Sequence, residues 1–420
     1  MKVKFLICSL FFFNLFFGSD YSYEDIPVQE SGRIKPLSTY SENQLLILYG
    51  KRSFKADSSK VSGIDWMLDV ITNPNDRINQ KVFYLSKWEN SPDVEVSLGL
   101  ANDNHYYSFQ EIFEGLGENK ELIVSLLNMP NEELTIVDQQ IINVYKKWDL
   151  YDKISNGLVV FLPLVDIDNK IIQEYLSINN KKISYSYLIR NLDQFKSLFK
   201  SLIDTAEDEW TDIHKKTADI FKQFQLIEYN LSQHASSFDH FKIIPSDDST
   251  NSGIWLSPIA VLLKDRSQKQ NKLLESYENF FSAYIDGDIA LMNNHSNSII
   301  HIASQIDSNL KINLLNKESN INKLAPFTKS MIFYILSFFI MGLSWVFYPS
   351  RLRKFALFFL FIGFLFHAYG LSLRMIVMQR PPVSTLYESI LFVNFILVLF
   401  SLIFEFFRKD SLGILIATFG

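Results

Sequence analysis

Three long apolar runs near the C-terminus constrain the fold of this chain more than any other feature. They cover Met331–Phe347, Phe355–Ile376 and Leu386–Phe407, and a further run, Leu412–Phe419, is too short to cross a bilayer. A helix of about 20 residues spans the hydrocarbon core, because each residue adds about 1.5 Å toward a thickness of about 30 Å. We therefore predict a polytopic α-helical membrane core in residues 329–420, with three spans and the start of a truncated fourth.

Basic residues predict the orientation of these spans. Arg351, Arg353 and Lys354 precede the second run, and Arg408 and Lys409 follow the third. Loops rich in lysine and arginine face the cytoplasm in most multi-span proteins. We therefore expect a multi-pass protein of the bacterial inner (cytoplasmic) membrane. Its large N-terminal region and the polar turn between the second and third runs are expected on the extracytoplasmic side.

The N-terminus has the features of an export signal. Two lysines precede the apolar stretch Phe5–Phe17, and Gly18-Ser19 provides a small-residue exit. We predict that residues 1–19 form a signal peptide, with an uncleaved N-terminal anchor as the alternative. Cys8 lies in this stretch and is the single cysteine of the chain, so the remainder can form no disulfide.

Residues 20–328 are polar and mixed, and their apolar residues recur mostly at helical spacing. This spacing predicts long helices at three places: Asn131–Lys153, Asp204–Gln233 and Lys272–Leu315. The last is expected to break near Asp286-Gly287. Strand-like runs are few, at Val82–Leu85 and Leu158–Val165. The chain is therefore predicted to be mainly α, with a large, mostly helical extracytoplasmic domain ahead of the membrane core.

Composition agrees with a membrane protein and argues against some other classes. The chain is 48% hydrophobic and contains 37 phenylalanines, which is high for a purely soluble domain. Its net charge of −6 shows no basic excess, so we expect no nucleic-acid partner. The histidines of residues 20–328 that could be considered as metal ligands lack a recognised ligand spacing, and we expect no metal site there: His214, His234, His240, His295 and His301.

The second apolar run carries small and polar residues on one face. Gly363, His367, Gly370 and Arg374 are separated by four, three and four residues, so they share a narrow stripe of a helix. Glycines let a flat macrocycle or a neighbouring helix approach the backbone closely. Imidazole can bind heme iron, and arginine pairs with carboxylates such as heme propionates. The stripe is therefore either a heme contact, with His367 as the metal ligand, or a packing face on which His367 hydrogen-bonds across the bundle.

The polar turn Arg380–Ser389 separates the second and third runs. Arg374 and Arg380 lie on the side where few cations are expected, which suggests an anionic partner. Snorkelling to lipid phosphates is the alternative. Thr385 and Glu388 have the spacing of a capping box, which makes Glu388 either the capping carboxylate of the third span or a cofactor contact.

This region resembles a known family. The segments Gly370-Leu371-Ser372-Leu373-Arg374 and Arg380-Pro381-Pro382-Val383-Ser384-Thr385-Leu386-Tyr387-Glu388-Ser389 are similar to the signature G-L-x-x-R…P-x-S-N-x-Y-E-S of the CcsA/ResC cytochrome c assembly proteins. Thr385 stands where that family usually has Asn. Residues 26–39, IPVQESGRIKPLST, resemble the P-V-Q-x-x-G-R-x-K-P-L-D-T opening of long CcsA-type proteins, with Ser38 in place of Asp.

The resemblance implies a role in System II cytochrome c maturation. The protein is then expected to handle or transport heme and to present it for covalent attachment to exported apocytochrome c, with a ResB/Ccs1-type membrane partner. Within this chain we expect His367 as the candidate iron ligand, Arg374 and Arg380 as propionate partners, and Tyr387 with Glu388 at the heme edge or in organising the turn. The family's better-defined ligand histidines occur further downstream. Membership of a heme-attachment synthase stays open, because this chain lacks the family's Trp-rich platform. The other hypothesis is a membrane-anchored extracytoplasmic binding or scaffolding protein without heme chemistry.

Overall fold

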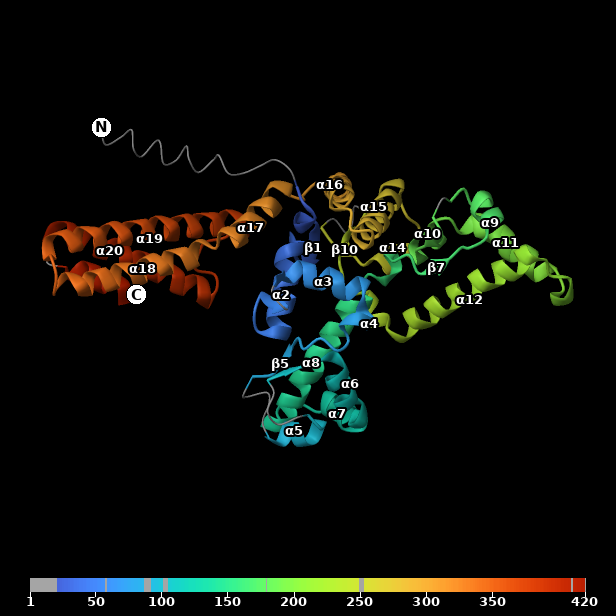
Figure 1. The fold of residues 1–420 in the computed structure, drawn as a ribbon, viewed down its shortest axis with the longest axis horizontal. Helices are drawn as coiled ribbons and strands as arrows, with labels where there is room; N and C mark the ends of the chain where they lie inside the picture. The colour runs from blue at the N-terminus through green and yellow to red at the C-terminus, as the bar shows by residue number, and fades with distance from the viewer. Residues whose placement is uncertain are drawn as a thin grey trace. The chain divides into compact units, whose positions relative to one another are not determined.

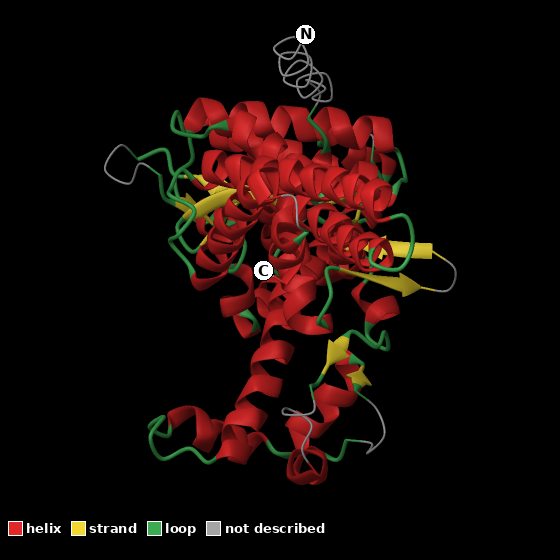
Figure 2. Ribbon diagram, turned by 90° about the vertical axis from the view of Figure 1, so that its left-hand side faces the viewer, coloured by secondary structure: helices red, strands yellow, loops and turns green. Residues whose placement is uncertain are grey.

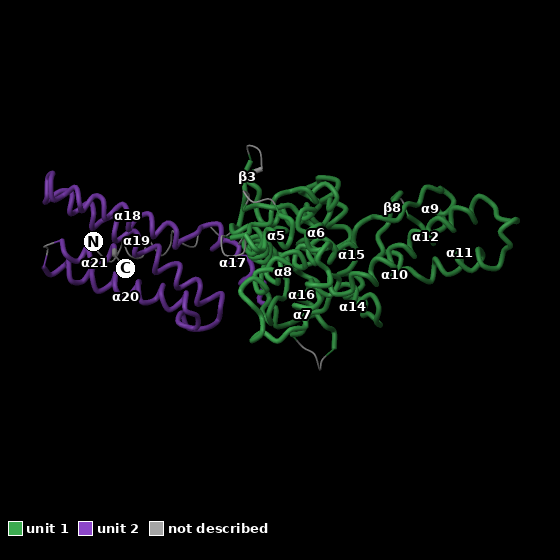
Figure 3. Tube along the Cα trace, turned by 90° about the horizontal axis from the view of Figure 1, so that it is seen from below, with its two compact units in different colours: residues 1–310 green, residues 311–420 purple. Residues whose placement is uncertain are grey.

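The computed structural model describes residues 21–56, 59–86, 92–100, 105–178, 180–248, 253–408 and 411–419. The predicted signal peptide, residues 1–19, lies outside the described residues. The chain divides into two compact units, residues 1–310 and 311–420, which Figure 3 colours green and purple. The helix Ile312–Leu324 belongs to the second unit, so the boundary between the units precedes residue 329, where the membrane core was predicted to begin.

Helices dominate the described chain (Figure 2), which confirms the predicted mainly α fold with few strands. The described strands pair only as two-stranded antiparallel sheets. These are β1 (Pro27–Glu30) with β2 (Arg33–Pro36), β3 (Ser53–Ala56) with β4 (Ser59–Ser62), β5 (Phe83–Tyr84) with β6 (Tyr106–Tyr107), β7 (Val165–Asp166) with β8 (Lys182–Ile183), and β9 (Ile244–Pro245) with β10 (Trp255–Leu256).

The helices of unit 1 follow one another with short connections (Figure 1). They are α2 (Leu37–Tyr49), α3 (Gly63–Thr72), α4 (Pro74–Arg77), α5 (Pro92–Leu98), α6 (Phe109–Glu118), α7 (Lys120–Asn128), α8 (Ile136–Asn156), α9 (Lys170–Tyr175), α10 (Tyr185–Arg190), α11 (Leu192–Asp204), α12 (Asp212–Gln233), α13 (Ala235–Phe238), α14 (Pro258–Leu262), α15 (Gln268–Ile285) and α16 (Ile289–Ile306). Short 3-10 helices lie at Tyr23–Asp25, Val159–Phe161 and Glu207–Glu209.

Local capping decides where the long helices of unit 1 begin. Helix α8 starts at Ile136 rather than at Asn131, because Thr135 and Asp138 form a capping box. The Asp138 N–H donates to the Thr135 hydroxyl at 3.2 Å, and the Thr135 N–H donates to the Asp138 carboxylate at 2.9 Å. Helix α12 likewise starts at Asp212, behind its N-cap, and not at residue 204.

The predicted break of the last long helix of unit 1 is confirmed. Helix α15 ends at Ile285 and α16 begins at Ile289. Gly287 between them has a φ of +73°, a left-handed conformation that glycine adopts without steric cost. The predicted stretch Lys272–Leu315 therefore comprises α15, α16 and the first turn of α17 (Ile312–Leu324).

The segment Leu158–Val165, predicted as strand-like, pairs only at its end. Residues 159–161 form a 3-10 helix, and Val165 begins β7. The ring of Phe161 stacks on those of Tyr277 and Phe281, with centroids 5.4 and 6.0 Å apart. Packing against α15 thus overrides the strand propensity of this apolar run.

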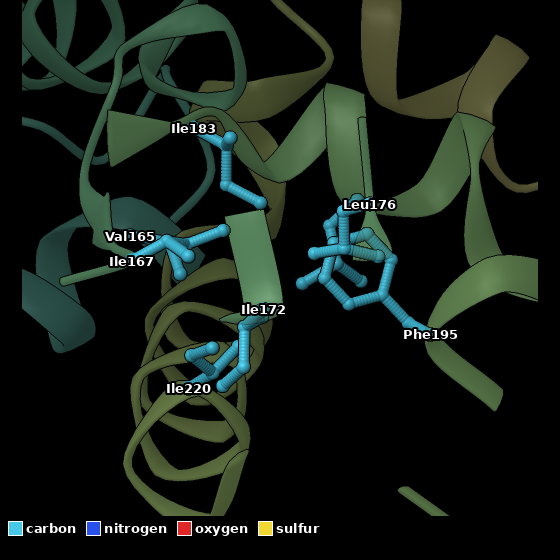
Figure 4. Packing of buried hydrophobic residues seen from close by; sticks show 8 residues of the cluster. Val165, Ile167, Ile172, Leu176, Ile183, Phe195 and Ile220 are labelled. Carbon is cyan, nitrogen blue, oxygen red and sulfur yellow. The ribbon is translucent and has the colours of Figure 1, made fainter. Parts of the chain in front are cut away.

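The helices α9 to α12, together with β7 and β8, enclose a core of their own (Figure 4). Val165 and Ile183 face each other in the register of the β7–β8 pair, and Ile220 of α12 packs against the same cluster. The other buried members are Ile167, Ile172, Leu176, Leu188 and Phe195. Burial of these side chains explains why such short strands and helices hold together, since each is worth about 1.5–3 kcal/mol when removed from water.

The N-terminal motif forms the β1–β2 hairpin and holds a distant segment of unit 1. Ser31 and Gly32, with φ of +50° and +77°, make its two-residue turn. The Gln29 side chain donates to the Gly253 carbonyl at 2.7 Å and accepts the Trp255 N–H at 2.9 Å. Gln29 of the motif therefore bonds residues that lie 224 and 226 positions further along the sequence.

Unit 2 contains the apolar helices. They are α17 (Ile312–Leu324), α18 (Pro326–Ser344), α19 (Pro349–Met378), α20 (Leu386–Arg408) and α21 (Leu412–Phe419). Three helices or helix pairs are long and apolar enough to cross a membrane: Ile312–Ser344, Pro349–Met378 and Leu386–Arg408. The described residues thus contain three candidate spans, as predicted, and the short fourth run is helical.

Buried small residues recur at heptad spacing on α18 and α19. On α18 they are Ser330, Ser337 and Ser344, and on α19 they are Ala356, Gly363 and Gly370. The Ser337 hydroxyl donates to the Ala356 carbonyl at 2.8 Å across the interface. A seven-residue repeat of small side chains lets two helices approach closely along their whole contact.

Candidate functional site

The polar cluster between α19 and α20 brings together four of the five predicted site residues. Arg374 Nε donates to Glu388 Oε1 at 3.1 Å, and Arg380 Nη2 donates to the same oxygen at 3.2 Å. The Arg374 guanidinium also lies over the Tyr387 ring, 5.3 Å from its centre, in a cation–π contact. We call Arg374, Arg380, Tyr387 and Glu388 the arginine cluster.

Local backbone features build the arginine cluster. Helix α19 ends at Met378, and its C-cap Gln379 adopts a left-handed φ of +53°. Two prolines follow Arg380, and proline without an N–H cannot continue a helix. The chain therefore turns sharply, which places Arg380 beside the first turn of α20.

Half of the predicted capping box is present. The Thr385 hydroxyl accepts the Glu388 N–H at 3.2 Å, as an N-cap does. The Glu388 carboxylate, however, is held by the two arginines, which compete successfully because charge-assisted hydrogen bonds are stronger than neutral ones. The capping carboxylate has thus become an ion-pair partner.

Charge in the arginine cluster is not balanced. Glu388 is only 1% exposed, and its second oxygen, Oε2, has no hydrogen-bond partner among the described residues. Two guanidiniums face one carboxylate, and Glu388 is the acidic residue with which each of them pairs in this part of the chain. One net positive charge remains, which suits the cluster to an additional anionic group.

His367, the fifth predicted residue, lies within the helix bundle. Its Nε2 is 3.1 Å from the Leu391 carbonyl of α20, and its Nδ1 is 3.3 Å from the Tyr334 hydroxyl of α18. A neutral ring that donates from Nε2 and accepts at Nδ1 satisfies both contacts. Its ring also meets those of Phe327 and Phe395 edge-on. His367 therefore links three helices.

The glycines beside His367 are covered by aromatic side chains. A Cβ added at Gly363 would lie 2.7 Å from the Tyr334 ring, and one added at Gly370 would lie 2.9 Å from the Phe327 ring. Helix α18 thus occupies the face that was considered for a macrocycle. In this arrangement both His367 nitrogens have partners within the bundle, and the Tyr334 and Phe327 rings cover the glycine face.

The arginine cluster differs from the His367 region in this respect. Its guanidiniums are partly exposed, and their remaining N–H groups have the geometry that pairs with carboxylates. The cluster fits the propionate end of heme, whereas iron ligation by His367 stays a prediction.

A second buried carboxylate, Glu405, lies near the end of α20, three residues before Arg408 in the sequence. In the structure Arg353 Nε of α19 lies 3.7 Å from Glu405 Oε1, and the Ser411 N–H donates to that oxygen at 3.2 Å. A Cβ on Gly413 would lie 2.5 Å from the Ser401 carbonyl, so α21 lies tightly against α20 beside Glu405. The sequence signal for this contact is Glu405 itself, because a carboxylate within an apolar helix is rare and is usually paired.

Comparison with known proteins adds no family assignment. No protein-family model matches the sequence, and a search of curated proteins returns no match.

Proposed function

We propose that this protein handles heme in cytochrome c maturation at the bacterial inner membrane, with Arg374 and Arg380 binding the heme propionates on the extracytoplasmic side. The observation that carries this proposal is the convergence of both guanidiniums on one oxygen of Glu388, at 3.1 and 3.2 Å. An arrangement that already binds one carboxylate and retains a positive charge suits a second carboxylate.

The exposed fractions of the three charged side chains indicate which of them an incoming ligand would meet first. The side chains of Arg374 and Arg380 are 28% and 42% exposed, whereas that of Glu388 is 1% exposed. An incoming carboxylate therefore meets the guanidiniums, each of which carries five N–H donors and uses one on Glu388. Glu388 orients both arginines before the ligand arrives, which reduces the entropy lost on binding.

The proposed partners follow from the resemblance to cytochrome c assembly proteins. They are heme, exported apocytochrome c and a ResB/Ccs1-type membrane protein. Heme supplies the vinyl groups that form thioethers with the apocytochrome. The chain's own contribution is to hold the carboxylate edge at the arginine cluster.

The cellular role is tested by deleting the gene in its host. Loss of covalently bound heme from c-type cytochromes, restored by the intact gene, is the expected result. Restoration should fail with an Arg374→Gln, Arg380→Gln double variant and succeed with Lys329→Gln, which removes a cation of α18 outside the arginine cluster. Normal c-type cytochromes in the deletion strain would contradict the proposal.

Binding is tested with the purified full chain in detergent. Hemin is compared with hemin dimethyl ester, which has the same ring but no carboxylates. We expect the protein to bind hemin about tenfold more tightly than the ester and the double arginine variant to bind both equally. Equal affinity of the unaltered protein for both compounds would exclude propionate recognition.

The packing of His367 favours the second hypothesis, a membrane-anchored binding or scaffolding protein. Its contacts with Tyr334 and Leu391 give it a structural role that needs no cofactor. Under this hypothesis Glu388 balances the arginines only to stabilise the α19–α20 turn, and hemin should not bind above the level of an unrelated membrane protein.

A further inference from the structure

A groove runs between α19 and α20 at the end of the bundle opposite the arginine cluster. Its volume is about 640 Å³, and its lining is apolar apart from Lys354. Leu357, Phe361 and Phe364 line it on α19, and Leu402 and Phe406 line it on α20.

The length of the groove corresponds to one leaflet. The rings of Phe364, which lines the inner end of the groove, and Phe395 stack at 5.0 Å between α19 and α20. Lys354 lies ten residues before Phe364, which is about 15 Å along a helix. That distance is half of the roughly 30 Å hydrocarbon core, the depth that an acyl chain of one leaflet reaches.

Charge at the Lys354 end specifies the head group. Lys354 and Arg351 are exposed, and neither forms an ion pair with a carboxylate of the described chain. The nearby Arg353 pairs with Glu405, and Arg408 lies over the Phe404 ring at 5.5 Å. Two cations therefore remain for an anion at the level where lipid phosphates lie.

We propose that this groove binds one acyl chain of an anionic glycerophospholipid, with its phosphate held by Lys354 and Arg351. The apolar wall contributes affinity for any acyl chain, and the two cations select the anionic head group. A zwitterionic lipid gains less, because its own positive charge opposes Lys354 and Arg351. The site is independent of heme and lies at the other end of α19 and α20 from the arginine cluster.

The test is native mass spectrometry of the full chain in detergent, titrated with phosphatidylglycerol or phosphatidylcholine of the same acyl composition. We expect phosphatidylglycerol to bind more tightly by about fivefold for each cation that contacts it. Lys354→Gln with Arg351→Gln should remove this preference. Lys329→Gln is the matched control, because Lys329 lies on α18 near Phe366, toward the opposite end of the bundle.

A second variant distinguishes binding in the groove from attraction by general surface charge. Leu402→Trp should fill the groove and weaken the binding of both lipids while leaving the cations in place. Equal affinity for the two lipids, an unchanged preference in the Lys354 and Arg351 double variant, or a dimer that excludes lipid from the groove would each overturn the proposal.

Discussion

Arg374 and Glu388 are joined across the α19–α20 turn, with Arg374 Nε 3.1 Å from Glu388 Oε1. The two residues are 14 positions apart, and the turn between them also brings Arg380 to the same oxygen. Glu388 is thus an anionic partner of both arginines within the chain. The pairing stabilises the turn and leaves the arginine cluster with an excess positive charge.

The Arg374–Glu388 pair should show strong energetic coupling. Arg374→Ala and Glu388→Gln should each lower the free energy of unfolding in detergent, and the double variant should lose less than their sum. We expect a coupling energy of about 1–3 kcal/mol, since the carboxylate is buried and the guanidinium is partly exposed. A Lys329→Gln, Glu388→Gln pair, whose members do not touch, provides the additive control. If the losses in free energy from Arg374→Ala and Glu388→Gln were also additive in the double variant, that result would contradict the ion pair.

Gly363 should tolerate no side chain. Gly363→Ala places a Cβ 2.7 Å from the Tyr334 ring, so α18 and α19 have to move apart locally. We expect this movement to lower the free energy of unfolding by about 1–3 kcal/mol. Gly342→Ala is the control, because a Cβ there meets nothing within 4 Å and alanine favours the helix by up to about 1 kcal/mol. The unfolding temperatures of the Gly363→Ala and Gly342→Ala variants, measured in the same detergent, test this difference. Equal shifts in unfolding temperature for the two variants would show that the contact between α18 and α19 does not depend on a small residue at position 363.

His367→Leu should destabilise the bundle. The change leaves the Leu391 carbonyl and the Tyr334 hydroxyl without their ring partner, at about 1–3 kcal/mol for each unsatisfied buried group. Thermal unfolding measures this loss. A structural role predicts unchanged hemin per folded molecule, whereas an altered Soret band with unaltered stability would support the heme-ligand prediction instead.

The orientation of the spans can be read with introduced cysteines. In a Cys8→Ser background, Ser384→Cys in the turn before α20 should react with an impermeant thiol reagent in intact cells, and Ser350→Cys at the start of α19 should not. Both side chains are exposed in the structure, so access depends on the side of the membrane. The reverse pattern would invert the predicted topology.

His240 should make unit 1 sensitive to mild acid. Burial lowers its pKa to about 4, assisted by the charge of Lys153, and its Nε2 lies 2.6 Å from the Tyr40 hydroxyl. An unfolded histidine takes up a proton near pH 6.5, so between about pH 6.5 and 4 the unfolded state binds more protons. The free energy of unfolding should fall by up to about 3 kcal/mol as the pH drops through this window, with no contribution from His240 above it.

Chemical denaturation at a series of pH values measures the effect of His240. His240→Gln should flatten the acid limb, and His301→Gln, which changes an exposed histidine, should leave it in place. An acid limb that persists unchanged in His240→Gln would assign the proton uptake to another group.

The number of candidate spans could be predicted from sequence, because a helix in lipid satisfies its own backbone and needs only about 20 apolar residues. The break before α16 was also predictable, since Gly287 supplies a left-handed turn at the point where the pattern changes. Helix starts such as that of α8 moved by several residues, because the capping residue Thr135 decided them and not the apolar stripe.

Local and tertiary effects separate clearly in the stripe of Gly363, His367, Gly370 and Arg374. Spacings of four and three residues fixed that these side chains share one helix face, which is a local consequence of 3.6 residues per turn. The occupant of that face was decided by helix packing: α18 brings Tyr334 and Phe327 against the glycines, and α20 brings Leu391 to His367. The partners of Arg374 and Glu405 were settled in the same way, because periodicity along one helix carries no information about which residues the crossing of two helices brings together.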